Sequence, residues 1–530
     1  MALSRRELLK HAGCAACAVG AQGLLLPQTD ARAADTFTRL DRAGKLRLAD
    51  QALDLAKRAG ALYADVRIGR MEDEYLGTRE KRLEELNTRL SVGIGIRVLL
   101  DGSWGFAASA LVDEAEVKTV LGRAVENAKA ARLLQANPIV LEELGSYVDD
   151  WHMPMLVDPF GVSIDEKAAQ LLAVNDAALK AGASYCSASL YILREEKFFA
   201  SSRGSRIEQS RVRIMPSFEV TATDKASGRF ATRKSLAAPR AAGFEYVASC
   251  DLPGEAEHAA EEAKQKLTAK PVIPGSYDLV IDATNLYLTV HESIGHGTEL
   301  DRALGYEANY AGTSFITPEK LGTFRYGSPL LTILADRSQE GGLATVRYDD
   351  DGVPSMEAAF PIIENGIFKN YQMAMGQAQA VGRARSNGCA YAQNPQSFPL
   401  QRMPNVSMKP NSKTMSRNDL IAGVDKGILI IGDGSWSIDQ QRYNFQFGGQ
   451  LFYEIKNGKR GAMLRDVAYQ ARAPEFWGAL DGLGDRSTYH LGGTFFCGKG
   501  QPEQIAPVSH GAVAARFRKI NVLNTERKDI

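Results

Sequence analysis

The sequence predicts an α+β protein, in which an N-terminal domain of helices packed on antiparallel sheet is followed by a β-rich C-terminal domain. In the first half, long segments with apolar residues at helical spacing alternate with shorter segments in which every second residue is apolar. Glycine and aromatic residues dominate the second half, most clearly over residues 425–497. The chain has 530 residues, 45% of them hydrophobic, and a formal net charge of zero. This composition is typical of a soluble globular protein of roughly two to four domains, and it excludes a disordered chain, a collagen-like repeat and a membrane bundle.

The first 33 residues, 1–33, have the features of a twin-arginine export signal. Ser4–Lys10 contains the arginine pair, Ala12–Leu26 is apolar but too short to span a bilayer comfortably, and Ala31–Ala33 is a small-x-small cleavage site. A chance arginine pair before a buried helix is the alternative, but the three parts occur in the order of a signal. The pattern resembles signals that export folded proteins, often with an inserted cofactor. We therefore expect a periplasmic protein of a bacterium.

The charge of the mature chain argues against nucleic acid as a partner. Four of the 63 Lys and Arg residues and two of the 63 Asp and Glu residues lie in the signal, so the remainder carries a net charge near −2. A phosphate-binding face usually shows as a basic surplus. No later apolar run approaches the length that a membrane span needs, so we expect no membrane span after signal removal.

The N-terminal domain is expected to cover residues 34–268. Apolar spacing predicts a first helix over 42–59, and alternating segments predict strands at 64–68 and 91–100. Asp101-Gly102 after the second strand is typical of a hairpin turn. Further helices are expected over 112–134, 164–181 and 255–267, and strands within 184–235, with turns at 203–205 and 227–228.

The C-terminal domain is expected to cover residues 269–530, after a linker at Lys270–Gly275 that contains two prolines. A short apolar strand over 276–281 and a helix over 285–300 come first. Hairpin turns are predicted where Asn-Gly pairs separate strand-like runs, at Asn365-Gly366 and Asn457-Gly458.

The mature chain keeps four cysteines that are far apart in the sequence and form no C-x-x-C pair, namely Cys186, Cys250, Cys389 and Cys497. A cysteine-only zinc cluster is therefore not expected. In an oxidising compartment they could form two disulfides, or they could be buried as small apolar residues.

The helix near the start of the second half contains the chemistry-bearing motif H-E-x-x-x-H, with His291, Glu292 and His296. Zinc-protease helices usually space their histidines at i and i+4, about 40° apart, whereas i and i+5 lie about 140° apart on a regular helix. Both imidazoles can reach one metal ion only if the helix bends, bulges or ends between them. Gly295 and Gly297 flank the second histidine and lower the cost of such a distortion.

Two unrelated histidines on one helix are the alternative interpretation, but the adjacent glutamate favours a metal centre. A carboxylate beside a metal-activated water can accept its proton and later pass it to a leaving amine. A catalytic zinc also needs a third protein ligand. The candidates are Cys497, His490, His510, Glu299 and Asp301. Among them, Cys497 would be an accessible thiolate flanked by glycines on a loop, and zinc binds sulfur readily.

Other groups near these motifs have simpler interpretations. Glu299 and Asp301 are expected to be solvated or to support the ligands from behind, and Lys499 to be an exposed loop residue. His490 and Tyr489 could donate to an oxyanion, although a structural role for the histidine is the simpler expectation. Phosphate-loop, nucleophile-elbow and dinucleotide motifs are absent: Gly493 to Lys499 spells G-x-x-x-x-G-K, but Gly500 stands where a hydroxyl is needed.

The motifs together resemble the TldD/PmbA family of metalloproteases. Besides His291-Glu292-x-x-Gly295-His296 and the late Cys497-Gly498-Lys499-Gly500-Gln501, other segments resemble family landmarks in family order: 350–354, 363–367, 402–405, and 447–449 followed by 455–459. The resemblance implies that His291, His296 and Cys497 bind zinc and that Glu292 is the catalytic base. The complete motif is similar to the catalytic TldD-type subunit, since sibling TldE/PmbA subunits usually lack it. The export signal is a departure, because well-known relatives are cytoplasmic.

We therefore predict a zinc-dependent peptidase that acts on short or unfolded polypeptides, which the β-rich half could bind by strand addition. Family likeness also implies a homodimer, or a heterodimer with a PmbA/TldE-like sibling. Two alternatives stay open. One is a non-catalytic binding or assembly subunit with a structural zinc, and the other is a zinc amidase that acts on a non-peptide bond.

Overall fold

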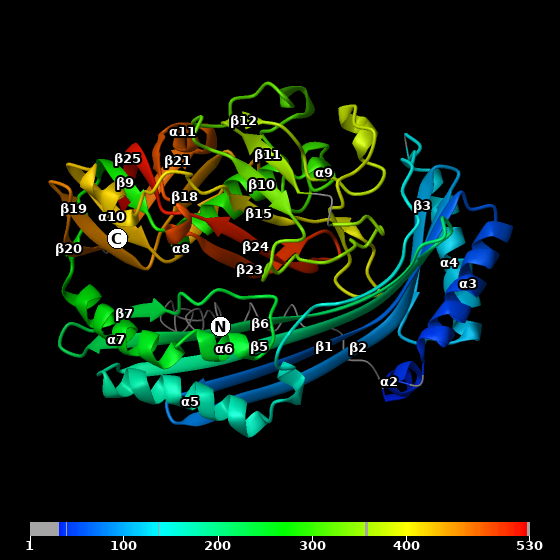
Figure 1. Ribbon diagram of the computed structural model, residues 1–530, viewed down its shortest axis with the longest axis horizontal. Helices are drawn as coiled ribbons and strands as arrows, with labels where there is room; N and C mark the ends of the chain where they lie inside the picture. Colours follow the sequence, from blue (N-terminus) through cyan, green and yellow to red (C-terminus); the bar gives the residue numbers. More distant parts are fainter. Residues whose placement is uncertain (1–30, 39, 136, 356–358, 527–530) are drawn as a thin grey trace, which may run out of the picture.

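The computed structural model describes residues 31–38, 40–135, 137–355 and 359–526, so the arginine pair and apolar stretch of the predicted signal lie outside the described residues. The predicted cleavage site lies at the start of α2 (Ala31–Thr38). The protein has a mixed α/β fold. Figure 1 shows a long curved N-terminal sheet with helices on its outer face and the C-terminal elements on its inner side. Among the described residues, no helix combines the length and apolar character required to cross a membrane.

Seven strands form the N-terminal sheet in the order β3-β2-β1-β5-β6-β4, with β7 also paired to β6. Neighbours are antiparallel except β4, which runs parallel to β6. The strands are β1 (Tyr63–Arg79), β2 (Arg82–Leu100), β3 (Ser103–Ser109), β4 (Val148–His152), β5 (Tyr185–Ser201), β6 (Arg206–Asp224) and β7 (Arg229–Lys234). Besides α2, the helices of this region are α3 (Arg42–Arg58), α4 (Glu114–Arg132), α5 (Ile164–Lys180), α6 (Glu245–Ser249) and α7 (Leu252–Thr268).

Local signals set the ends of these elements much as the sequence predicts. The carboxylate of Asp113 accepts hydrogen bonds from the first amides of α4, whose first turn is acidic and whose last turn is basic. Asp101 and Gly102 have φ of 49° and 77°, as the tight turn between β2 and β3 requires. Strands β1 and β2 are longer than predicted. Residues 82–86 of β2 are all exposed, so buried and exposed side chains do not alternate there, but the backbone still pairs with β1.

Ten strands form the C-terminal sheet in the order β17-β18-β21-β25-β9-β16-β19-β20-β8, with β22 also paired to β25. Strand β8 lies inside the predicted linker and pairs in parallel with β20. The strands are β8 (Lys270–Pro271), β9 (Gly275–Ile281), β16 (Lys426–Ile431), β17 (Trp436–Ile438), β18 (Asn444–Phe447), β19 (Leu451–Lys456), β20 (Lys459–Arg465), β21 (Val467–Arg472), β22 (Leu480–Leu483) and β25 (Ala515–Asn524).

Smaller sheets and helices complete the C-terminal part. A four-stranded sheet has the order β12-β11-β10-β15, and two-stranded sheets are formed by β13 with β14 and by β23 with β24. These strands are β10 (Ile333–Asp336), β11 (Phe360–Glu364), β12 (Ile367–Phe368), β13 (Ala390–Tyr391), β14 (Leu400–Gln401), β15 (Asn405–Met408), β23 (His490–Lys499) and β24 (Gln504–Ala512). The α-helices are α8 (Ala283–Val290), α9 (Leu300–Ala303), α10 (Arg417–Ala422) and α11 (Ala473–Gly478). Both predicted Asn-Gly hairpin turns are present, between β11 and β12 and between β19 and β20.

The largest apolar core surrounds α8. In this core the helix packs against both the C-terminal sheet and the four-stranded sheet. It includes Leu286 and Val290 of the helix, Ile281 of β9 and Ile333 of β10. Because α8 leads directly into the H-E-x-x-x-H segment, this core fixes the position of the candidate site.

Buried ion pairs connect the two parts of the chain. Arg97 of the N-terminal sheet donates to Asp351 at 2.7 Å, and Lys197 donates to Asp350 at 2.8 Å. Buried pairs of this kind constrain geometry, since removing one partner leaves an uncompensated charge. The Asp350-Asp351 landmark therefore fastens the C-terminal part to the curved sheet.

Candidate metal centre

The helix that carries the two histidines changes its hydrogen-bonding pattern at His291. Helix α8 ends at Val290 and continues as a π-helix over His291–Gly295 and a 3-10 turn over His296–Thr298. The amide of His296 donates to the carbonyl of His291, which is the i to i+5 bond of a π turn. The structure thus contains the bulge that the i and i+5 spacing requires.

Gly295 serves this turn by its small size rather than by its conformational freedom. Its φ and ψ are −52° and −64°, which any residue adopts. A Cβ atom at this position would lie 2.7 Å from Sδ of Met403, too close for an ordinary contact. The sequence analysis expected glycine here because it adopts distorted backbone conformations easily. In the structure, glycine is needed instead because the lack of a Cβ atom lets the helix approach Met403.

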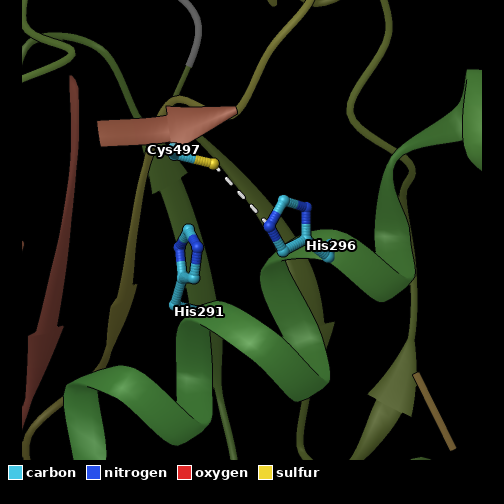
Figure 2. A group of neighbouring side chains, drawn as sticks. All are labelled: His291, His296 and Cys497. Carbon is cyan, nitrogen blue, oxygen red and sulfur yellow. Dashed lines mark hydrogen bonds between the residues drawn. The ribbon is translucent and has the colours of Figure 1, made fainter. Parts of the chain in front are cut away.

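His291, His296 and Cys497 come together at the end of this helix. One ligand atom from each lies within 4.8 Å of the other two, and the Cys497 sulfur lies 3.7 Å from Nε2 of His296. Figure 2 shows the thiol of β23 reaching down towards the two imidazoles of the helix. Tetrahedral zinc, with bonds of about 2.0 Å to nitrogen and 2.3 Å to sulfur, holds neighbouring ligand atoms about 3.5 Å apart. The three groups therefore fit zinc in both chemistry and spacing.

Cys497 lies in a strand and is buried, not on an accessible loop as expected. Only 4% of its surface is exposed. The guanidinium of Arg402 donates to its carbonyl oxygen at 2.5 Å and fixes β23 at this point. Burial raises the pKa of the Cys497 thiol, and the Arg402 charge lowers it in part. All four cysteines of the described residues are free thiols, so the disulfides considered from the sequence are not present.

His296 is oriented by a buried charge network. Its Nδ1 lies 2.8 Å from the carboxylate of Glu299, and Lys499 donates to the other oxygen of that carboxylate at 3.1 Å and to Asp301 at 2.8 Å. The expected solvation of the two acids and the expected exposure of the lysine were wrong, since these three side chains are buried. The other expectation, that the acids support the ligands from behind, agrees with the contact between Glu299 and His296. Burial raises the pKa of Glu299, but the Lys499 charge and the hydrogen bond with His296 outweigh it and hold that pKa well below its usual range. With Nδ1 of His296 occupied, Nε2 is left to face Cys497.

His291 is oriented by another histidine. Its Nδ1 lies 2.6 Å from Nε2 of His510, whose Nδ1 lies 3.2 Å from the carbonyl oxygen of Val406. Burial lowers the pKa of His510 to about 3, so that its ring is neutral. His510 therefore lies behind His291 and outside the three-residue group, although the sequence offered it as a third ligand. The two histidines are 219 residues apart in the sequence, and no local sequence pattern indicates that they are in contact.

Glu292 forms an ion pair that the sequence analysis missed. Nη1 of Arg442 donates to its carboxylate at 2.6 Å. Burial raises the pKa of Glu292, while the Arg442 charge and then the Arg302 charge lower it. Arg442 has a φ of 63° and comes from a loop 150 residues away, so only the three-dimensional structure brings the two together.

His490 and Tyr489 have contacts other than the three candidate ligands. His490 lines a cavity of about 40 Å³ together with Tyr287 and Asp433. The hydroxyl of Tyr489 accepts a hydrogen bond from Gln339. His490 does not belong to the group formed by His291, His296 and Cys497, so it is not the third ligand that the sequence also offered.

Three domains of one family match consecutive parts of the chain. They are described as PmbA/TldA metallopeptidase domain 1, central domain and C-terminal domain, and they match residues 64–131, 157–270 and 274–523. This chain belongs to the PmbA/TldD family. The C-terminal match contains the whole candidate centre, and the resemblance inferred from the motifs is confirmed at the level of the family.

Named relatives of this PmbA/TldD protein are metalloproteases. One from Methanocaldococcus jannaschii is 27% identical over 459 residues, which are 86% of this chain and 95% of the relative. A metalloprotease TldD homolog of Haemophilus influenzae is 24% identical over 87% of this chain and 93% of its own. A zinc metalloprotease TldD homolog of Saccharolobus solfataricus is 27% identical over 47% of this chain and 52% of its own.

Solved structures share the fold. A Thermotoga maritima protein described as a modulator of a DNA gyrase has a TM-score of 0.69 at 16% identity, and the match covers 90% of this chain and 100% of that one. TldE from Thermococcus kodakarensis has a TM-score of 0.67 at 16% identity, covering 90% and 99%. At such low identity these matches establish the mixed α/β fold alone.

Proposed function

We propose that this protein is a zinc-dependent peptidase that cleaves short or unfolded polypeptides. His291, His296 and Cys497 are the zinc ligands in this proposal, and Glu292 is the general base. The observation that carries it is the convergence of two imidazoles and a thiol, supplied by a π turn and a strand, beside a buried carboxylate. The metalloprotease names of the relatives support the same reaction class.

The ligand tautomers agree with this proposal. Both Nδ1 atoms are occupied, by His510 and by Glu299, so each histidine offers Nε2 as its free nitrogen. Bound zinc supplies Lewis-acid polarisation of a carbonyl and a water of lowered pKa. Glu292 accepts a proton from the attacking water and passes it to the leaving amine. An intact base beside the ligands has no use in a purely structural zinc site.

The enclosure of the centre supports a preference for flexible substrates. His291, Glu292, His296 and Cys497 are each exposed by 5% or less. A folded domain cannot bring a peptide bond to groups so deeply buried, whereas an extended chain can. Strand β17 is at the end of the strand order of the C-terminal sheet and carries the exposed Trp436, so it offers an edge for strand addition.

The assembly and the compartment are part of the proposal. We infer a homodimer, or a heterodimer with a TldE-like sibling, because the fold matches TldE. We infer a periplasmic location from the twin-arginine pattern of residues 4–10.

The decisive experiment measures cleavage of a peptide mixture by the purified mature protein, with and without a zinc chelator. Chelator-sensitive cleavage is expected. Glu292→Gln should keep its zinc and lose about 10²–10⁴-fold in turnover, whereas Glu454→Gln, an exposed control, should behave as wild type. A zinc-loaded wild type without cleavage would contradict a peptidase and favour the assembly subunit, and cleavage of non-peptide amides alone would favour the amidase.

A further inference from the structure

We propose that Arg442 is a second catalytic residue, which stabilises the oxyanion that forms on the substrate carbonyl as Glu292 takes up a proton. This inference rests on the proposed peptidase function. It is carried by three observations: a strained backbone at Arg442, a buried guanidinium Nε that has no hydrogen-bond partner among the described residues, and a position beside both the base and the turn that carries His296.

A tight turn between β17 and β18 holds Arg442 in a left-handed conformation. Its φ of 63° costs a residue with a Cβ atom about 1–2 kcal/mol. Asp439 closes the turn, since its carbonyl accepts from the amide of Arg442 and its carboxylate accepts from the amides of Tyr443 and Asn444. Such strain persists only where the surroundings enforce it, and it is common at functional sites. Here it aims the arginine side chain at Glu292.

The guanidinium has more donors than the resting structure uses. Nη1 donates to Glu292 at 2.6 Å, while Nε is buried and has no hydrogen-bond partner among the described residues. A guanidinium carries five N–H donors, and a buried donor without a partner costs about 1–3 kcal/mol. This unpaired donor belongs to the same guanidinium that contacts the base, and a polar group of a bound substrate could supply the missing acceptor.

Arg442 also faces the candidate ligands. A Cβ atom on Gly297 would lie 4.0 Å from Cβ of Arg442, so the arginine covers the turn that follows His296. A fixed cation at this place opposes the binding of a divalent metal ion, and it lowers the proton affinity of the neighbouring base. A counter-ion role for Arg442 would explain how the charge of Glu292 is balanced. It would not explain why a general base is paired with a cation that lowers its proton affinity.

Proton transfer gives the arrangement a catalytic purpose. As the attacking water loses a proton to Glu292, its oxygen forms a bond to the carbonyl carbon, and the electron pair of the C=O bond moves onto the carbonyl oxygen. Glu292 becomes neutral in the same step in which that oxygen becomes negative. Arg442 thus exchanges one anionic partner for another, and its interaction with the oxyanion exists only after the attack has begun. Interactions of that kind lower the barrier rather than merely tighten binding.

The test compares Arg442→Met and Arg442→Lys in the zinc-loaded mature enzyme, with Arg472→Met as an exposed control from the neighbouring strand β21. Four quantities are measured: kcat and KM for a cleaved peptide, the zinc Kd, and the Kd of a phosphinic analogue of that peptide, whose anionic oxygen imitates the oxyanion. We expect Arg442→Met to lower kcat by about 10²–10³-fold with little change in KM. Phosphinate affinity should fall by a similar factor, Arg442→Lys should be intermediate, and zinc affinity should be unchanged or higher.

The same comparison in a Glu292→Gln background separates oxyanion binding from a counter-ion role. Glutamine carries no charge for Arg442 to balance. If Arg442 were only a counter-ion, its replacement would therefore not change phosphinate binding in this background. If Arg442 contacts the oxyanion, Arg442→Met still weakens phosphinate binding in this background by at least about tenfold. A loss below about twofold would overturn the proposal, because the effect of Arg442 would then pass through Glu292 alone.

Failure of the peptidase function would give a different result. In that case wild type neither cleaves the peptide nor binds the phosphinate, although the protein is folded. Thermal unfolding of each variant shows whether a loss reflects misfolding, and a destabilised Arg442→Met is replaced by Arg442→Lys in the comparison. A folded Arg442→Lys with wild-type kcat and wild-type phosphinate affinity in both backgrounds would also contradict a role for the planar guanidinium.

Discussion

Nδ1 of His291 lies 2.6 Å from Nε2 of His510, and this contact decides which nitrogen of His291 is free for a metal ion. The carbonyl oxygen of Val406 can only accept, so Nδ1 of His510 carries a hydrogen and its Nε2 accepts from His291. His296 reaches the same tautomer through a carboxylate instead, that of Glu299. The two imidazoles of the centre are therefore preset by partners of different charge.

Removal of His510 should weaken metal binding without removing a ligand. His510→Ala frees His291 to rotate and to change tautomer, and loss of such a partner typically costs about 10–100-fold in metal affinity. His510→Gln, which can accept from His291, should restore part of the affinity. Competition with a chromogenic chelator measures the zinc Kd. The exposed His152→Ala serves as control, and equal affinities for it and His510→Ala would contradict the positioning role.

Cys497→Ser should remove most of the bound zinc and leave the fold largely intact. Serine has almost the same shape, but its hydroxyl is a much poorer zinc ligand than a thiolate. Metal analysis and circular dichroism of the purified variant measure the two effects. Cys389→Ser, another buried free thiol, is the matched control and should keep its zinc. Full zinc content in Cys497→Ser would move the third ligand elsewhere.

The structure should tolerate alanine at Gly297, in the 3-10 turn, but not at Gly295, in the π turn. At position 295 the new Cβ would lie 2.7 Å from Sδ of Met403, whereas at position 297 its nearest contact outside the turn would be the Tyr326 hydroxyl at 3.4 Å. We expect Gly295→Ala to lower the free energy of unfolding by about 1–3 kcal/mol, as overpacked cores do. Denaturant unfolding measures this, and Met403→Ala in the same chain should recover part of the loss. Equal stability of the two alanine variants would show that Met403 does not restrict the turn.

Export should depend on the arginine pair that precedes the apolar stretch. Replacement of Arg5 and Arg6 by lysine should leave an uncleaved, zinc-containing protein in the cytoplasm. Cell fractionation with metal analysis of the purified protein measures both properties.

A general secretory signal should deliver a poorer enzyme. The unfolded chain would then expose Cys497 to an oxidising compartment, where it could pair with another of the four thiols that are free in the fold. A thiolate captured by zinc in the cytoplasm is protected while the site stays occupied. If the rerouted protein has full zinc content and full activity, the signal determines only the destination of the protein and does not affect zinc loading.

Elements with local signals could be predicted from the sequence, and contacts between distant segments could not. Helix α5 follows from its apolar spacing and its Ser163 cap, and the hairpin at Asn365-Gly366 follows from turn chemistry. The spacing of His291 and His296 even demanded a distorted helix. Burial of Lys499 was hidden, because the carboxylates that compensate its charge lie about 200 residues away.

The partners of the centre were missed for the same reason. His510 stands in strand β24 among apolar residues, and nothing in that segment indicates that its ring meets His291. Arg442 occupies a left-handed position that sequences usually give to glycine or asparagine, so its turn did not stand out. Groups whose role depends on tertiary contacts leave no trace in local periodicity.

The π turn at His291–Gly295 amounts to a single inserted residue between α8 and the 3-10 turn His296–Thr298. Deleting one residue between Glu292 and Gly295 would convert the motif to H-E-x-x-H, the arrangement of the zinc-protease helices, with both imidazoles on one face of an uninterrupted α-helix. The motifs H-E-x-x-x-H and H-E-x-x-H therefore differ by one inserted residue, which is accommodated by the i to i+5 hydrogen bond of the π turn. A search for distant kinship between such enzymes should allow a gap at this point of the helix rather than require identical spacing.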